Sequence, residues 1–152
     1  MRIGLAADHE GYELKEQILE ALGKMPLQIC DYGALNLNPQ DDYPDFVIPL
    51  AKAIQDQDID RGIAICGSGI GACIAANKIH RVRAGIIQDL FSARQGVEDD
   101  DMNVICLGAR LLTLPLALEL IQCFLSAQFS GAPRHQRRLA KIAKLEETEI
   151  RI

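Results

Sequence analysis

A glycine-rich turn in the middle of the chain combines a thiol with closely spaced backbone amides. The sequence from residue 62 to 71 is G-I-A-I-C-G-S-G-I-G, so Cys66 is followed by Gly67, Gly69 and Gly71 at alternate positions. Glycines allow successive N–H groups to point into one concavity, where they bind an anionic oxygen. The same amides and the start of a following helix favour the thiolate form of a cysteine. The segment therefore predicts a phosphate, carboxylate or enolate site in which Cys66 is a base or a nucleophile.

Two nucleotide-binding motifs also place glycines between a strand and a helix. The dinucleotide fingerprint has the spacing G-x-G-x-x-G after a first strand, whereas this loop has G-x-G-x-G and follows the third apolar run. A Walker A loop ends in Gly-Lys-Ser or Gly-Lys-Thr, which is missing here. A nucleotide-binding module is therefore the weaker alternative.

Polar residues follow two other apolar runs. Asp8 and His9 follow the first run, and Arg110 follows the fifth. Because the carboxyl ends of parallel strands meet at one edge of a sheet, these residues and the glycine loop are expected to lie together. Asp8 is also a common helix-capping residue, which would explain its presence without a function.

Short apolar runs alternate with amphipathic stretches along the whole chain. The runs cover residues 3–7, 27–30, 62–66, 82–87 and 104–107, and helical spacing marks the segments around 14–22, 47–54 and 117–124. Thr113 is the expected cap of the last of these helices, and Pro49 predicts a late start or a kink in the second. This alternation predicts a three-layer α/β/α Rossmann-like sandwich with a five-stranded parallel sheet.

Two charged segments lie outside this pattern. Residues 134–148 contain five basic residues within eleven positions, which predicts a basic helix that is either a solvated face or an arm that meets an anion. The run Glu98-Asp99-Asp100-Asp101 is typical of a solvated helix end, and we favour this over a divalent cation site. No metal site is therefore predicted.

Composition excludes several classes of protein. The 152 residues carry 21 acidic and 16 basic side chains, so a net charge of −5 argues against a nucleic-acid-binding protein. No apolar run approaches 18 residues, so no membrane span is expected. The five cysteines are scattered and odd in number, which favours a reduced, cytoplasmic protein. Apart from Cys66, they are interpreted as buried free thiols.

Taken together, the motifs resemble ribose-5-phosphate isomerase B and its relatives, the galactose-6-phosphate isomerase subunits. The matching segments run in family order across nearly the whole chain: Gly4–Gly11, Leu14-Lys15, Asp42-Tyr43-Pro44, Ile65–Gly71, Ala75–Lys78, Val82–Ala84, Met102–Val104, Gly108–Arg110, and Arg134-His135 with Arg138. The resemblance implies a single domain over residues 1–152 in which the basic helix, 134–152, reaches the site of a neighbouring subunit in a homodimer or tetramer.

The resemblance also implies a reaction and a set of site residues. The reaction interconverts ribose 5-phosphate and ribulose 5-phosphate through an enediolate, without metal or organic cofactor. Cys66 matches the proton-transferring base, with Ser68 beside it, and the amides of Gly67–Gly71, including Gly69 and Ile70, match the group that stabilises the enediolate oxygen. The expected substrate contacts are Asp8, His9, Tyr43, Asp100, Asn103 and His135, with Arg110, Arg134 and Arg138 on the phosphate.

One position departs from the family. Many members have a histidine, assigned to opening the sugar ring, where this chain has Asp99. Either His9 or His135 takes over ring opening, or Asp99 acts as a protonated acid, or the protein prefers a different or open-chain sugar phosphate. The alternatives are therefore an isomerase of another pentose, tetrose or hexose phosphate, such as allose or galactose 6-phosphate, or a non-catalytic sugar-phosphate-binding paralogue.

Overall fold

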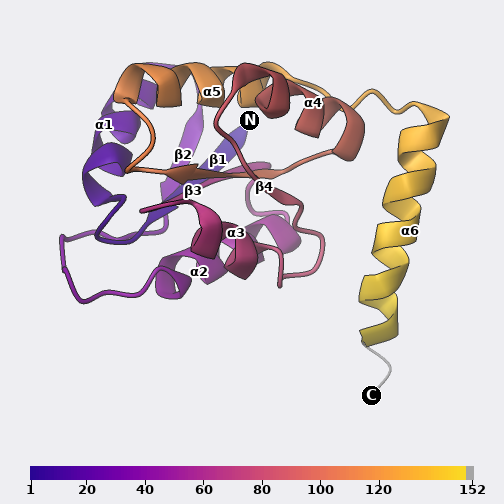
Figure 1. Ribbon diagram of the computed structural model, residues 1–152, viewed down its shortest axis with the longest axis horizontal. Helices are drawn as coiled ribbons and strands as arrows, with labels where there is room; N and C mark the ends of the chain where they lie inside the picture. Colours follow the sequence, from indigo (N-terminus) through magenta and orange to yellow (C-terminus); the bar gives the residue numbers. More distant parts are fainter. Residues whose placement is uncertain (150–152) are drawn as a thin grey trace.

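Five short apolar segments form one parallel sheet in the computed structural model, which describes residues 1–149 (Figure 1). The strands are β1 (Arg2–Ala7), β2 (Gln28–Asp31), β3 (Arg61–Cys66), β4 (Ala84–Ile86) and β5 (Val104–Gly108), in the order β2-β1-β3-β5-β4. Every neighbouring pair is parallel. The predicted architecture is confirmed, although β4 is shorter than the apolar run around it.

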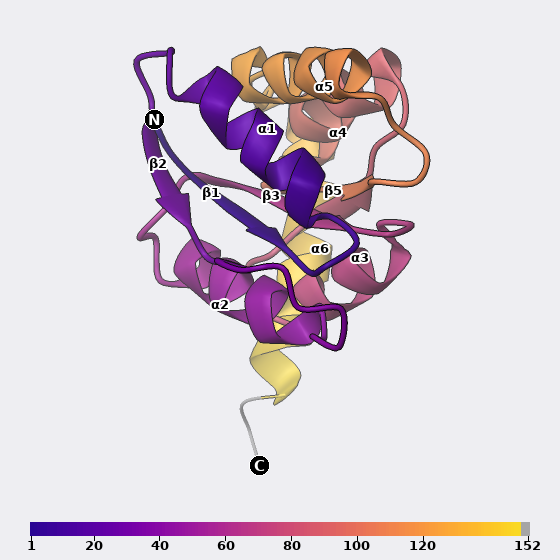
Figure 2. The ribbon, with the colours of Figure 1, turned by 90° about the vertical axis from the view of Figure 1, so that its left-hand side faces the viewer.

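Helices cover both faces of the sheet. α1 (Tyr12–Leu22), α4 (Leu90–Asp100) and α5 (Leu114–Ser126) pack on one face, and α2 (Pro44–Gln55) and α3 (Ile70–Ala76) on the other (Figure 2). β1, β3 and β5 are almost completely buried between the layers, which explains their near-continuous apolar sequences. As predicted, the side chain of Thr113 caps α5.

The expectation of a late start for α2 is wrong. The helix begins at Pro44, where the fixed backbone angle of proline suits the first helical position and its missing N–H is not needed. It continues through Pro49 because Val47, Leu50 and Ile54 on its inner face are buried against the sheet. Burial of that face outweighs the local cost of an internal proline.

The last helix stands outside both layers. α6 (Pro133–Glu149) runs beside the sheet and projects past it (Figure 1). Both oxygens of Glu146 lie 3.0 Å from the backbone nitrogen of Arg81, in the segment that leads into β4. A groove beside α6 is lined by Arg2, Asp60 and Asn103, which lie at or next to the starts of strands. α6 therefore lies at the amino edge of the sheet, and residues 150–152 of the predicted basic segment lie outside the described residues.

Candidate active site

Three loops meet at the carboxyl edge of the central strands. The N–H of Ala109 donates to the carbonyl of Cys66 at 2.8 Å, and the N–H of Arg110 donates to the carbonyl of Gly67 at 3.1 Å. On the other side, the guanidinium of Arg110 is ion-paired at 2.6 Å with Glu10, which follows β1. The ends of β1, β3 and β5 thus come together as the sequence predicts.

The glycine loop is packed so closely that two of its glycines cannot be replaced without strain. Gly69 has a φ of +81°, and a Cβ there would lie 3.2 Å from the carbonyl carbon of Leu107. A Cβ on Gly71 would lie 2.6 Å from the ring of Tyr43. Tyr43, one of the predicted substrate contacts, therefore lies directly against the loop.

Cys66 is buried, but its sulfur faces the loop. Only 5% of the residue is exposed, and Sγ accepts the backbone N–H of Gly69 at 3.2 Å. Beside it, the hydroxyl of Ser68 is exposed and accepts the N–H of Ile70 at 3.2 Å. The thiol thus contacts a backbone amide as well as hydrocarbon.

A second thiol near the loop differs from its interpretation as a buried free thiol. Cys73 is only partly buried, and a hydrogen bond with Cys106 lowers its pKa to about 7, although burial acts in the opposite direction. The same hydrogen bond and burial raise the pKa of Cys106. The pair joins α3 to β5, and 33 positions separate the two residues, so their spacing gave no signal.

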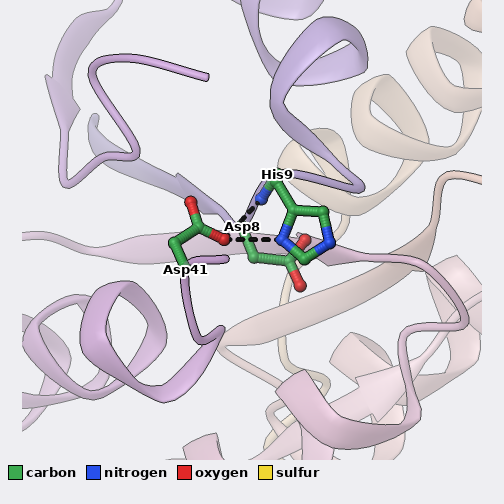
Figure 3. A group of neighbouring side chains, drawn as sticks. All are labelled: Asp8, His9 and Asp41. Atoms are coloured by element: carbon green, nitrogen blue, oxygen red, sulfur yellow. Dashed lines mark hydrogen bonds and ion pairs between the residues drawn. The ribbon is translucent and has the colours of Figure 1, made fainter. Parts of the chain in front are cut away.

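His9 is held by a carboxylate that the sequence did not single out. Asp41, in the loop between β2 and α2, accepts the backbone N–H of His9 at 2.9 Å and lies 2.7 Å from its Nδ1 (Figure 3). This hydrogen bond raises the pKa of His9, whereas desolvation lowers it. Asp8 uses Oδ1 to accept the N–H groups of Glu10 and Gly11, and burial raises its pKa.

The group Asp8, His9 and Asp41 also resembles a possible set of metal ligands. One ligand atom from each of the three lies within 4.8 Å of the others. However, the 2.7 Å separation between His9 Nδ1 and Asp41 Oδ1 is that of a direct hydrogen bond, so these two atoms are already partners of each other. The geometry is that of an oriented histidine rather than a coordination shell.

The remaining predicted residues lie at the opposite edge of the sheet. α4 follows β4 and returns to the amino edge, so Asp99 and Asp100 at its end lie far from the glycine loop in the same chain. Asn103 precedes β5 at that edge, where its amide contacts the backbone of Arg81 and Arg83. The first turns of α6 add Arg134 and Arg138, both exposed, and His135.

Asp99 contacts the first turn of α6, the helical arm of this chain. Its Oδ2 accepts from the side chain of Gln95 at 3.0 Å, and its Oδ1 lies 3.4 Å from Nε2 of His135. His135 is only 3% exposed, so the contact joins α4 to α6 in the interior of their junction. Asp99, where the resemblance led us to expect a histidine, is therefore a partner of His135.

Comparison with known proteins finds similarity along almost the whole chain. A family model described as Ribose/Galactose Isomerase matches residues 3–142. Ribose-5-phosphate isomerase B of Mycolicibacterium paratuberculosis is 38% identical over 97% of this chain and 93% of that protein.

Solved structures agree with this match. Ribose-5-phosphate isomerase B of Clostridium thermocellum superposes with a TM-score of 0.93 at 40% identity, covering 98% of this chain and 99% of the other. The enzyme of Mycoplasma genitalium, solved with bound ribulose 5-phosphate, has a TM-score of 0.90 at 39% identity and 96% coverage of both chains. Among residues 1–149, none of the helices is long and apolar enough to cross a membrane.

Proposed function

Because the chain belongs to the ribose/galactose isomerase family and is a sugar-phosphate isomerase, we propose that it interconverts ribose 5-phosphate and ribulose 5-phosphate. The proposal is supported by the full-length similarity to ribose-5-phosphate isomerases, one of them solved with ribulose 5-phosphate. The single observation that carries it is the contact between Cys66 Sγ and the N–H of Gly69. In this proposal the sulfur of Cys66 acts beside the backbone amides that would hold an anionic oxygen.

In the proposed mechanism, Cys66 shuttles one proton between two carbons. Its thiolate removes the proton from C2 of the open-chain aldose, and the electron pair moves to form a C1–C2 double bond while the C1 carbonyl oxygen becomes negative. The amides of Gly67–Gly71 stabilise that oxygen in the enediolate. The Cys66 thiol then returns the proton to C1, and the proton of the C2 hydroxyl is transferred to the C1 oxygen, so that C1 becomes CH₂OH and C2 becomes the carbonyl carbon of the ketose.

Ring opening is assigned to His9 rather than Asp99. Both carboxylate oxygens of Asp99 already face Gln95 and His135. His9 lies at the carboxyl edge beside the glycine loop, and its ring is 28% exposed. A protonated His9 can donate to the ring oxygen of the substrate, which is the task of a general acid.

We further propose that the site is completed by a second copy of the chain. Arg134 and Arg138 lie on α6, which stands at the opposite edge of the sheet from Cys66 in the same chain. Exposed apolar side chains on α3, β4 and α4 are expected for a surface that packs against another molecule. They are Ile70, Ile74, Ile86, Leu90 and Phe91. A homodimer or tetramer would bring the arm of one subunit to the glycine loop of another.

A panel of aldose phosphates tests the proposal. We expect kcat/KM to be highest for ribose 5-phosphate among ribose 5-phosphate, erythrose 4-phosphate, allose 6-phosphate and galactose 6-phosphate. A higher value for another aldose would change the substrate but keep the reaction. Thermal stabilisation by these compounds without turnover of any of them would mean a binding protein and would contradict the proposed function.

A further inference from the structure

A buried carboxylate from a distant loop fixes the ring of His9. Asp41 Oδ1 lies 2.9 Å from the backbone nitrogen of His9 and 2.7 Å from its Nδ1, so one oxygen holds both the main chain and the ring. The side chain of Asp41 is 8% exposed, against 28% for His9. Figure 3 shows Asp41 meeting the Nδ1 side of the ring, while the other ring nitrogen points away from it.

This geometry determines which nitrogen carries the proton. An ionised carboxylate can only accept hydrogen bonds, so Nδ1 of His9 must be the donor. The second oxygen of Asp41, Oδ2, is buried without a hydrogen-bond partner in the part of the chain that the structure describes. A buried carboxylate with an unpaired oxygen is stabilised by a nearby cation. The His9 ring is the titratable group to which the Asp41 carboxylate is hydrogen-bonded.

The other charged groups near His9 are already engaged. Glu10 Oε1 lies 3.8 Å from Nε2 of His9, but it lies 2.6 Å from Arg110. Asp8 acts on His9 through its charge, and its Oδ1 is used by backbone N–H groups. Asp41 is therefore the group that orients the ring, and Nε2 is the nitrogen on the side of Glu10.

We propose that Asp41 is a positioning residue of the isomerase site: it fixes the orientation and the Nδ1 proton of His9, so that Nε2–H is presented to an oxygen of the sugar phosphate. The inference rests on the proposed function for the identity of the substrate. The pairing itself is a property of the protein without substrate and can be measured separately.

The first experiment uses the unaltered protein. Two-dimensional ¹H–¹⁵N spectra of the imidazole groups, with His9 identified by comparison with His9→Gln, report which nitrogen is protonated. We expect His9 to carry a proton on Nδ1 at every pH at which the protein is folded. A neutral His9 with the proton only on Nε2 would overturn the proposal.

The second experiment removes the charge of Asp41. In Asp41→Asn the pKa of His9 should fall toward the ordinary histidine value, because the main cause that raises it is lost. The matched control is Asp45→Asn, which removes one negative charge from an exposed residue of the next helix and should leave His9 almost unchanged. Asp41→Glu, which keeps the carboxylate, should restore part of the effect and serves as the test if Asp41→Asn does not fold. The proposal would be contradicted by an unchanged pKa of His9 in Asp41→Asn. It would also be contradicted if the pKa of His9 in Asp41→Glu were not raised above the ordinary histidine value.

The third experiment separates positioning from a purely structural role. Protonated His9 is the donor, so His9 gives kcat/KM an alkaline limb, on which kcat/KM falls as the pH rises through the pKa of His9. In Asp41→Asn this alkaline limb should move to lower pH, with kcat/KM above neutral pH reduced about tenfold for each unit by which the pKa of His9 falls. A uniform reduction with no movement of the limb would overturn the inference.

The two proposals fail in different ways. If no aldose phosphate is turned over while the His9 titration depends on Asp41, the proposed function is wrong and the pairing stands. If ribose 5-phosphate is turned over and the alkaline limb is the same in both proteins, the positioning role of Asp41 is wrong.

Discussion

At the scale of single residues, Glu10 occupies a place that suits an anion. Its carboxylate contacts Arg110 through two hydrogen bonds, at 2.6 and 3.2 Å, and lies 3.8 Å from the Nε2 of His9. The Arg110 guanidinium is the main cause that lowers the pKa of Glu10. A substrate phosphate would present the same kind of oxygens to Arg110, so this guanidinium already has the geometry that the proposed phosphate contact requires.

Replacing Arg110 by lysine tests whether the shape of this cation matters. Lysine keeps the charge but cannot offer two parallel N–H groups, so we predict that KM rises about tenfold while kcat changes little. Steady-state kinetics on ribose 5-phosphate measure both. Arg2→Lys is the matched control, because Arg2 also pairs with a carboxylate, that of Asp60, but at the amino edge. An equal rise of KM in both variants, or none in Arg110→Lys, would exclude a phosphate contact for Arg110.

At the scale of elements, the turn from β3 to α3 depends on close backbone packing. Gly69 combines a positive φ with a Cβ direction that points at the backbone of β5, so both its conformation and its surroundings require glycine. The N–H of Gly69 also contacts the sulfur of Cys66. A shift of this turn would therefore move the amide away from the proposed base.

Alanine substitutions at two glycines separate these effects. Gly131 also has a positive φ, +66°, but a Cβ there would meet only the side chain of Gln136 at 3.6 Å. Gly131→Ala should lower the free energy of unfolding by about 1 kcal/mol from the backbone conformation alone. Gly69→Ala should lower the free energy of unfolding by about 1–3 kcal/mol more, because of overpacking. This variant should also lose most of its activity. Urea unfolding and turnover measure the two quantities. Equal stability and activity in both variants would show that the packing around Gly69 is unimportant.

The elements were predictable from the sequence because each is encoded locally. The runs 3–7, 62–66 and 104–107 are almost entirely apolar, as strands buried on both faces must be, and the structure confirms them. The glycine loop was recognisable because its residue types are needed at the turn itself.

The partners of two key residues were not predictable in this way. Asp41 reaches His9 from 32 positions away through the irregular segment between β2 and α2, and no local pattern marks which of its acids turns inward. The contact of Asp99 with His135 depends on how α6 meets α4. Such pairs are fixed by the packing of distant segments, so they appear only in three dimensions.

At the scale of the whole molecule, the two halves of the proposed site face away from each other. Cys66, His9 and Arg110 lie at the carboxyl edge of the sheet, whereas Arg134 and Arg138 lie on the arm at the amino edge. A second copy related by a two-fold axis would place each arm at the other subunit's glycine loop and form two equal sites.

Mixing two inactive variants tests this arrangement. Cys66→Ala and the double variant Arg134→Ala/Arg138→Ala should each be inactive or nearly so, because each pure oligomer contains only defective sites. After joint unfolding and refolding, hybrid dimers contain one intact site, so about a quarter of the unaltered activity should return if subunits mix at random. The variants mixed without unfolding are the control. No recovery despite hybrids detected by native mass spectrometry would show that each chain forms its own site.

The most direct measurement is proton exchange at the carbon beside the carbonyl group, followed by NMR with ribose 5-phosphate in D₂O. The unaltered protein should incorporate deuterium from solvent into the sugar as it forms ribulose 5-phosphate. Cys66→Ala should slow both exchange and isomerisation by about a hundredfold or more, while ribose 5-phosphate still raises its melting temperature. Exchange and isomerisation at the unaltered rate in Cys66→Ala would show that another group moves the proton.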